Sequence, residues 1–358
     1  MKKTIAFFTG NRSEWGLLKP LALKLQDKYN VKVIACASHF SCTYNTFLDI
    51  ISDFDCERVE NSLDSNTPNG CCKSSGILFI NLPDILDRIN PEFVVILGDR
   101  YESMVCSLVC YIMDYKIIHL HGGEKSGNID NAFRDCISRL SYIHCTATEL
   151  SALNLVSLNY DNVYYAGSLG CVNLPRADNK DSNILTVLYH PITQGEKENF
   201  DHILDSIWEF CKNKNKIHDV HFVLPNNDFG NKIIKEKIKN FTQNYFYINN
   251  HVHVHLKRED FLKLLSKSLC VIGNSSCGII EAPAIGIYTL NVGFRQNYRE
   301  KASSIITTYC CKEDILNGFS EMDKNNFKPD LSDIPYRDNN VIENIFHIID
   351  KEFNNDLS

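Results

Sequence analysis

The sequence predicts an α/β fold made of two doubly wound, Rossmann-like domains that face each other across a cleft. Two observations lead to this prediction. Apolar runs that fit strands alternate with helical patterns in the first half of the chain, and a second series of the same kind starts near residue 170. Such alternation is typical of parallel sheets covered by helices on both faces. The 358 residues also suffice for two domains, at roughly 150 residues per domain.

In the first half, short apolar runs predict four strands, and Leu17 to Leu25 has the apolar spacing of a helix. The strands are expected at Thr4 to Thr9, Val31 to Ala37, Phe93 to Leu97 and Ile117 to Leu120. The third run ends at Gly98-Asp99-Arg100 and the fourth at His121-Gly122-Gly123-Glu124. Charged residues therefore follow the carboxyl ends of strands, which is the edge where open parallel sheets bind ligands.

The second series shows the same arrangement of polar residues after strands. Its predicted strands are Ile184 to Tyr189, His221 to Leu224 and Cys270 to Ile272, followed by His190-Pro191-Ile192-Thr193, Pro225-Asn226-Asn227-Asp228 and Gly273-Asn274-Ser275. The last segment, Asn340 to Phe353, is an amphipathic helix. We therefore expect domains at residues 1–170 and 171–335, followed by a C-terminal helical segment at 336–358.

Residues 57–76 are rich in Asn, Ser, Asp and Gly and are predicted to form a loop between helices. Two hypotheses remain open for this segment. It is either a surface insertion or a lid over the cleft.

Composition excludes several classes of protein. The chain has 44% hydrophobic and 23% charged residues and a net charge of -7, so neither disorder nor a general attraction to nucleic acid or anionic membranes is expected. No run approaches the roughly 18 apolar residues of a membrane span, and the apolar run in MKKTIAFFTG is too short for a signal peptide. The 15 cysteines lie mostly in apolar surroundings, without the spacing of zinc sites. We expect a reduced cytoplasmic protein without metal or cofactor.

The segment GNSSCGIIEAP at residues 273–283 combines a polar start with an apolar continuation. Ser275 and Ser276 are N-cap candidates after a strand, and a helix N-terminus suits a phosphate. Glu281 is expected about six residues into that helix, where its carboxylate can accept hydrogen bonds from sugar hydroxyls. The structural alternative is a capped helix whose Glu281 meets a surface cation.

Three further residues fit an anion site. Arg295 follows a strand and a glycine, Arg12 stands in a strand-turn-helix segment of the same form, and His190 lies at a strand end of the second domain. The segment around Arg12 is not a GxGxxG fingerprint, so a dinucleotide-dependent dehydrogenase is disfavoured.

The acidic residues Asp99, Glu124 and Asp130 are expected to share one cleft, with Arg134 one helical turn beyond Asp130. Crowding of carboxylates raises the pKa of at least one member, which allows acid and base roles to coexist near neutral pH. The structural alternative is that Asp99 pairs with Arg100 or Arg134 and that Asp130 caps a helix.

Taken together, seven motifs resemble the hydrolysing UDP-N-acetylglucosamine 2-epimerases, which begin sialic acid synthesis by releasing N-acetylmannosamine and UDP. The motifs are TGNRSEWGLLKPL, GDRYE, HGGEKSGNIDNAFR, YHPIT, PNNDFG, GNSSCGIIEAP and NVGFRQNYRE. They occur in the family's order and spacing, and the resemblance extends from Thr9 to about Arg299.

The resemblance implies the two-domain GT-B fold, with the C-terminal helix packing back toward the first domain. It implies that the UDP is held by Arg12, His190, Asn226, Ser275, Ser276, Glu281 and Arg295, with Glu281 on the ribose. Asp99, Glu124 and Asp130 would surround the sugar, so we expect the catalytic groups to be these three and His190. Arg100 and Arg134 are expected to contact the substrate, and the chain to form a dimer or tetramer.

The chain departs from the family's pattern on the sugar side. It has Arg134-Asp135 where the family usually has Arg-His, Tyr298 where the family has Gly, and FSCTYNTF after His39 where a Pro and a Gly are usual. Other substrates therefore stay open, namely a UDP-linked 2,4-diacetamido-6-deoxy hexose or GDP-N-acetylglucosamine. A GT-B glycosyltransferase and a nucleotide-sugar-binding regulator without catalysis are the alternatives from other classes.

Overall fold

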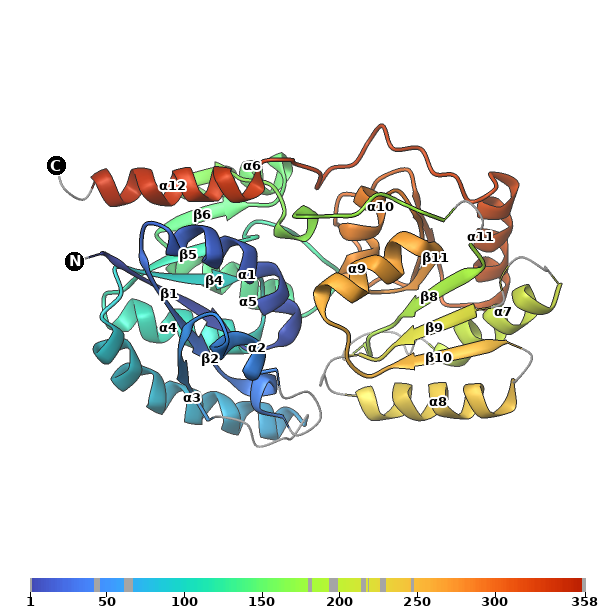
Figure 1. The fold of residues 1–358 in the computed structure, drawn as a ribbon, viewed down its shortest axis with the longest axis horizontal. Coiled ribbons are helices and arrows are strands. Elements are labelled where there is room, and N and C mark those ends of the chain that lie inside the picture. The colour runs from blue at the N-terminus through green and yellow to red at the C-terminus, as the bar shows by residue number, and fades with distance from the viewer. Residues whose placement is uncertain are drawn as a thin grey trace. The chain divides into compact units, whose positions relative to one another are not determined.

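The computed structural model divides the chain into two compact units (Figure 1). Unit 1 comprises Met1–Lys125, Ile129–Val172 and Asp338–Ser358, and unit 2 comprises Ser126–Asn128 and Asn173–Arg337. The structure describes residues 2–41, 46–60, 67–179, 182–192, 199–213, 217, 219–225, 230–245 and 248–355. Each unit holds one parallel sheet with helices, so the predicted α/β fold with two parallel-sheet domains is confirmed.

In unit 1, seven parallel strands form a sheet in the order β3-β2-β1-β4-β5-β6-β7. They are β1 (Thr4–Thr9), β2 (Asn30–Ala35), β3 (Asp55–Arg58), β4 (Phe93–Leu97), β5 (Lys116–Leu120), β6 (Ile143–Thr146) and β7 (Val163–Tyr165). The helices are α1 (Arg12–Gln26), α2 (Leu48–Ile51), α3 (Pro68–Ile89), α4 (Tyr101–Ile112), α5 (Asp130–Leu140), α6 (Glu149–Ser157) and α12 (Val341–Asn355), with short 3-10 turns at η1 (Ala37–Phe40) and η2 (Leu169–Cys171).

In unit 2, six parallel strands form a sheet in the order β10-β9-β8-β11-β12-β13. They are β8 (Ile184–Leu188), β9 (Asp219–Val223), β10 (Asn249–His253), β11 (Ser268–Gly273), β12 (Tyr288–Val292) and β13 (Ile305–Thr308). The helices are α7 (Phe200–Asn213), α8 (Asn231–Asn244), α9 (Arg258–Lys267), α10 (Glu281–Ile285) and α11 (Lys312–Lys324), with a 3-10 turn at η3 (Ser276–Gly278).

The strand order of each sheet reverses at one point. In unit 1 the reversal lies between β1 and β4, and in unit 2 it lies between β8 and β11. Loops that leave the carboxyl ends of such a strand pair diverge to opposite faces of the sheet, which opens a crevice for a ligand. The polar segments after β1, β4, β8 and β11 therefore follow the strands at which binding is most expected, and those after β5 and β9 follow the adjacent strands.

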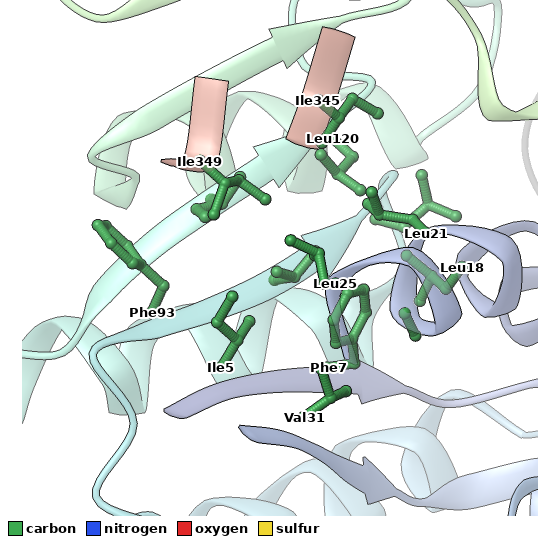
Figure 2. Packing of buried hydrophobic residues seen from close by; sticks show 14 of the residues in the cluster. Ile5, Phe7, Leu18, Leu21, Leu25, Val31, Phe93, Leu120, Ile345 and Ile349 are labelled. Atoms are coloured by element: carbon green, nitrogen blue, oxygen red, sulfur yellow. The ribbon is translucent and has the colours of Figure 1, made fainter. Parts of the chain in front are cut away.

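The core of unit 1 includes the C-terminal helix. Ile345 and Ile349 of α12 pack with Leu18 and Leu21 of α1 over one face of the sheet (Figure 2). The ring of Phe353 completes this contact, since it stacks on Tyr29 with 4.6 Å between ring centroids. Because burying a large apolar side chain stabilises the fold by about 1.5–3 kcal/mol, helix α12 is an integral part of unit 1.

The predicted strands begin and end within two residues of the observed ones, because uninterrupted apolar runs mark strands that are covered on both faces. The predicted C-terminal helix at Asn340 to Phe353 is likewise confirmed as α12.

The prediction of a loop between helices at residues 57–76 was wrong over much of its length. Glu57 and Arg58 belong to β3, and α3 begins at Pro68. Thr67 caps this helix by accepting a hydrogen bond from the amide of Gly70 at 3.1 Å, and Pro68 occupies the first helical position, where its missing N–H costs nothing. The capping pair outweighs the glycines and serines that follow. Residues 61–66 lie outside the described part of the chain, so the lid hypothesis remains a prediction.

Within the described residues, no helix combines the length and the apolar character that a membrane crossing requires.

Candidate functional site

The candidate residues of unit 1 follow three adjacent strands. Arg12 begins α1 after β1, Asp99 and Arg100 follow β4, and Glu124 lies four residues after the end of β5. Because β4 pairs with both β1 and β5, these residues leave neighbouring strand ends. The structure thus brings together, at the strand-order reversal of unit 1, residues that are up to 112 positions apart in the printed sequence (124 minus 12).

A capping arrangement fixes the turn that carries Arg12. Asn11 is the N-cap of α1, and its side chain accepts a hydrogen bond from the amide of Glu14 at 3.0 Å. The Glu14 carboxylate in turn accepts from the amide of Gly10 at 2.8 Å. This reciprocal pair satisfies backbone donors that the helix leaves open. Arg12 is therefore held at the first position of a well-capped helix.

Arg134 of α5 connects the two acidic segments. Arg134 is 1% exposed. Its guanidinium forms an ion pair with Asp99 and donates a hydrogen bond to the backbone oxygen of Glu124 at 3.0 Å. A third hydrogen bond reaches the Asn131 side chain at 2.8 Å. A buried guanidinium that satisfies three acceptors fixes their relative positions. Arg134 thus holds the loop after β4 against the loop after β5.

The sequence left two partners open for Asp99, and the structure shows Arg134 as its partner. Arg100 instead forms a two-point ion pair with Glu102, with N–O distances of 3.1 and 3.2 Å. Asp130 is the first residue of α5, whose N-cap is Ile129. The alternative in which Asp130 caps the helix was therefore wrong.

Glu14 and Glu102 place two buried carboxyl groups beside one guanidinium. Glu14 is 9% exposed and Glu102 1% exposed, and the Glu14 carboxylate lies 3.9 Å from Nε of Arg100. Burial raises the pKa of Glu14 to about 7, while Arg100 works in the opposite direction. Unit 1 therefore contains a carboxyl group that titrates near neutral pH because it is buried, and this group is not one of the three acids for which crowding was expected to raise a pKa.

The HGGE segment forms a tight turn. His121 has φ 63° and Gly123 has φ 78°, and a Cβ at Gly123 would lie 2.2 Å from the backbone oxygen of Ser151. Only glycine fits this close approach. The turn brings Glu124, which is 4% exposed, back toward His121, whose Nδ1 lies 3.7 Å from the Glu124 Oε1.

His119 supports the loop before Asp99. Its Nε2 donates to the backbone oxygen of Gly98 at 2.8 Å, and its Nδ1 accepts from the Ser138 hydroxyl at 2.9 Å. Burial lowers the pKa of His119 to about 3, so the ring stays neutral near pH 7. A neutral imidazole that makes two hydrogen bonds therefore supports the turn that carries Asp99.

In unit 2, Asn274 joins the loops at the strand-order reversal. Its Oδ1 accepts from the amide of His190 at 2.7 Å, and its Nδ2 donates to the backbone oxygen of His190 at 2.9 Å. The Asn274 backbone oxygen accepts from Arg295 at 3.0 Å and from Gln296 at 2.8 Å. Asn274 is fully buried, so these four bonds fix the segments that carry His190 and Arg295.

The bounds predicted for the helix after the strand that ends at Gly273 were wrong. Ser275 caps only the 3-10 turn η3 and makes no side-chain cap bond, and α10 begins at Glu281. Glu281 is therefore the first residue of a five-residue helix rather than a residue in its second turn. Pro283 explains the late start, because its ring is tolerated only in the first turn of a helix. Within the turn, the amides of Gly278, Ile279 and Ile280 donate to the backbone oxygens of Ser275 and Ser276.

Glu281 has an internal cationic partner. Arg258 of α9 lies 3.4 Å from its Oε1, and both side chains are largely buried. Burial raises the pKa of Glu281, and the guanidinium of Arg258 offsets part of that effect. The alternative in which Glu281 meets a surface cation was thus wrong in its detail, since the cation is buried with it.

The Arg295 segment is tied to the residues just after HGGE. The amide of Gly127 donates to the backbone oxygen of Arg295 at 3.1 Å, and a Cβ at Gly127 would lie 2.0 Å from the oxygen of Phe294. Residues 126–128 accordingly belong to unit 2. Glycine at position 127 is required by this close backbone contact.

The structure leaves one predicted residue undescribed and adds others. Asn226 lies outside the described residues. Asn274, Arg258, Glu14 and His121 were not singled out from the sequence, although Asn274, Glu14 and His121 stand inside motifs that were identified. The available signal for Asn274 was its place at a strand end. The contact of Arg258 with Glu281 spans 23 positions and has no local signal.

No group of three or more His, Cys, Asp or Glu side chains in the described ranges is arranged to hold a metal ion.

Buried histidines predict an acid-sensitive fold. Burial lowers the pKa of His39 and His144 to about 4 and that of His119 to about 3, against 6.5 in the unfolded chain. The unfolded chain therefore binds more protons, so their contribution to stability is complete above pH 6.5 and is lost as the pH falls toward 4. Glu14 acts in the opposite direction between pH 7 and 4.5, because its pKa is raised. We expect urea unfolding to show a loss of about 2 kcal/mol or more between pH 6.5 and 4.5.

The matched test replaces one of these rings. His144→Phe replaces a buried imidazole, which meets the ring of Tyr160 edge to face, with a ring that cannot be protonated, so the slope of unfolding free energy against pH should become shallower. Exposed His347 is the control, and His347→Gln should leave the slope unchanged. An equal slope in the His144 variant and the unmodified protein would contradict the prediction.

The family described as UDP-N-acetylglucosamine 2-epimerase matches residues 21–350 of the chain. Among curated proteins, the UDP-N,N'-diacetylbacillosamine 2-epimerase (hydrolyzing) of Legionella pneumophila is 28% identical over 90% of this chain and 89% of its own length. The polysialic acid biosynthesis protein P7 of Escherichia coli is 28% identical over 98% of this chain and 94% of its own length.

Solved structures agree in fold. The UDP-GlcNAc 2-epimerase from Neisseria meningitidis, solved with UDP-GlcNAc bound, has a TM-score of 0.78 at 20% identity and covers 98% of this chain and all of its own. Similarity at this level of identity concerns the fold, and it extends over both parallel-sheet units.

Proposed function

The chain belongs to the UDP-N-acetylglucosamine 2-epimerase family, and from this premise we propose that it is a hydrolysing enzyme, which converts UDP-N-acetylglucosamine and water to N-acetylmannosamine and UDP. The observation that carries the proposal is the set of acids at the strand-order reversal of unit 1. Asp99 and the Glu124 segment are joined there by the buried Arg134, and Asp130 begins the helix that contains this arginine.

The reaction requires more than one acid. The proton on C2 of the sugar is poorly acidic because no carbonyl group lies beside it, so its removal has to accompany departure of the UDP from C1. A base at C2 and stabilisation of the leaving diphosphate therefore act together. The products of this step are a glycal and UDP. Water then adds its oxygen to C1, and a proton is delivered to the opposite face of C2, which gives the manno sugar.

We assign the proton transfers to Asp99, Glu124 and Asp130, with His190 as a further proton donor. The nearby cation Arg134 is buried and already bound to protein acceptors, which supports a positioning role for it rather than substrate contact. Arg100 remains a candidate for substrate contact.

We assign the UDP to the loops of unit 2, and the family resemblance adds Arg12 to the proposed nucleotide-binding residues. The buried Asn274 holds the segments of His190 and Arg295, which supports a preformed diphosphate site. Ser275, Ser276 and Asn226 complete the proposed set, and Glu281, oriented by Arg258, would accept hydrogen bonds from the ribose hydroxyls.

A second candidate substrate is a UDP-linked 2,4-diacetamido-6-deoxy hexose. The observation that favours it is the 28% identity to a relative named as a hydrolysing diacetylbacillosamine 2-epimerase. The departure from the family pattern at Asp135 lies beside Arg134 on the helix that Asp130 begins, which supports keeping this candidate. The chemistry at C1 and C2 is the same for both sugars.

The proposal includes a homo-oligomer, dimer or tetramer, that works in the cytoplasm without metal or cofactor. The free thiols of the cysteines in the described residues support a reducing compartment.

A screen of nucleotide sugars tests the function. The protein is incubated separately with UDP-N-acetylglucosamine, the UDP-linked diacetamido sugar and GDP-N-acetylglucosamine, without any acceptor, and nucleotide release is followed. We expect UDP from the first, with N-acetylmannosamine identified as the free sugar. Release from the diacetamido sugar alone would transfer the assignment to the second candidate, and release only after addition of a sugar acceptor would indicate a glycosyltransferase.

A further inference from the structure

His121 is the first residue of the HGGE turn and has two defined neighbours. Its Nε2 accepts a hydrogen bond from the backbone amide of Leu169 at 3.1 Å, and its Nδ1 lies 3.7 Å from the Oε1 of Glu124. His121 is 9% exposed, Glu124 is 4% exposed and Leu169 is fully buried. The ring is therefore held between a backbone donor on one side and a carboxyl group on the other.

The backbone donor fixes the tautomer of this ring. A peptide N–H can only donate, so Nε2 must present its lone pair to Leu169. In the neutral imidazole the hydrogen then resides on Nδ1, which is the atom that faces Glu124. A second proton on Nε2 would break a buried hydrogen bond and bring two donors together, which is costly. The structure thus defines His121 as a neutral ring whose N–H points toward the acid.

The backbone supports the same arrangement. His121 has φ 63°, a left-handed conformation that residues other than glycine adopt uncommonly, with asparagine, aspartate and histidine the most frequent exceptions. It persists here because the turn is fixed elsewhere. Gly123 packs against the backbone of α6, where the side chain of Asn154 donates to the Gly123 oxygen at 3.0 Å, and Arg134 binds the Glu124 oxygen. Strain that surrounding contacts maintain at a strand end is typical of functional turns.

We propose that His121 is a positioning residue for Glu124: its Nδ1–H donates to the Oε1 of Glu124 and orients the ionised carboxylate for proton acceptance. The inference rests on the proposed function, because it concerns how Glu124, one of the proposed catalytic acids, acts. The present 3.7 Å separation exceeds a hydrogen bond, and such bonds often shorten when substrate is bound. A carboxylate that accepts an N–H bond is stabilised in its charged form, so Glu124 would enter the reaction as a base.

Two substitutions separate the two sides of the ring. The side-chain amide of asparagine lies where Nδ1 of histidine lies, so His121→Asn retains a donor toward Glu124, loses the acceptor for Leu169 and tolerates the left-handed backbone. Glutamine reaches the position of Nε2, so His121→Gln retains an acceptor for Leu169 and loses the donor toward Glu124. For folding alone, the Leu169 hydrogen bond favours glutamine and the left-handed backbone favours asparagine, so the unfolding free energy of each variant is measured beside its kcat. A role toward the acid favours asparagine.

We expect kcat of His121→Gln to fall by about 10- to 100-fold and kcat of His121→Asn to fall severalfold less, with KM changed little in either. The acid limb of the kcat/KM profile should move to higher pH in the glutamine variant, because the charged carboxylate has lost its donor. His144→Gln is the control. His144 is a buried histidine of strand β6 in the same unit, and the mechanism does not use this side chain. The reverse order of the two His121 variants, or equal activity, would overturn the inference.

A measurement on the unmodified protein keeps the inference testable if a variant fails to fold. Nitrogen-15 NMR of histidine-labelled protein distinguishes Nδ1–H from Nε2–H tautomers, and the His121 signal is identified by its loss in His121→Asn or another substitution. We expect the Nδ1–H tautomer, unchanged between pH 6 and 8. An Nε2–H tautomer would contradict the inference whatever the activity. Absence of turnover by the unmodified protein would contradict the proposed function and leave the tautomer result standing.

Discussion

Asp99→Asn is expected to abolish release of UDP from the nucleotide sugar while leaving UDP binding intact. Loss of a positioned acid or base typically costs about 10²- to 10⁴-fold in rate, and asparagine keeps the shape of aspartate without its charge or its proton. The binding residues of unit 2 are untouched by the substitution. UDP affinity, measured by calorimetry, should therefore stay within about threefold of the unmodified protein while kcat falls at least 10²-fold.

Asp161→Asn is the matched control for this prediction. Asp161 lies in an exposed turn of the same unit and has no part in the proposed mechanism. Its variant should retain the activity of the unmodified protein. An Asp99 variant that turned over as fast as the control, with a folded circular dichroism spectrum, would remove Asp99 from the catalytic set.

Arg134→Met is expected to destabilise unit 1 by about 3 kcal/mol, because removing one partner of a buried ion pair leaves the other poorly compensated. The Asp99 side chain is 25% exposed, which keeps the cost at the lower end of the usual range. The substitution also removes the donors to the Glu124 oxygen and to Asn131. Urea unfolding measures the effect, and activity should fall with it, since both acidic loops lose their common support.

Arg139→Met provides the control on the same helix. Arg139 is exposed, and its replacement should change the unfolding free energy by no more than about 0.5 kcal/mol. The variant that combines Asp99→Asn with Arg134→Met should be less destabilised than the sum of the two single changes, because the partners are in contact. Simple additivity would contradict the pairing of Asp99 with Arg134.

The strands and their polar ends were predictable because both signals are local. A continuous apolar run such as Phe93 to Leu97 marks a strand covered on both faces, and the residues that follow it reach the binding edge of a parallel sheet. The two-domain α/β fold followed from repeating this pattern. The error at residues 57–76 also has a local cause. Asn, Ser and Gly indicate a loop there, and the Thr67-Pro68 pair, which begins α3, is the stronger signal.

The partners of the charged residues were not predictable, because they depend on which loops the sheet brings together. Arg100 is adjacent to Asp99 in sequence, yet the partner of Asp99 is Arg134, which is 35 positions away. The contact between His121 and Leu169 spans 48 positions and has no local signal. The role of Asn274 was not predictable either, because its four hydrogen bonds form only when three loops of unit 2 converge.

The central claim is that the chain hydrolyses a nucleotide sugar with inversion at C2. The most direct test is incubation with UDP-N-acetylglucosamine in deuterated water, followed by NMR of the products. We predict UDP and free N-acetylmannosamine that carries deuterium at C2, because the proton added to the glycal comes from solvent. A UDP-linked manno sugar, or UDP release without deuterium at C2, would contradict the claim.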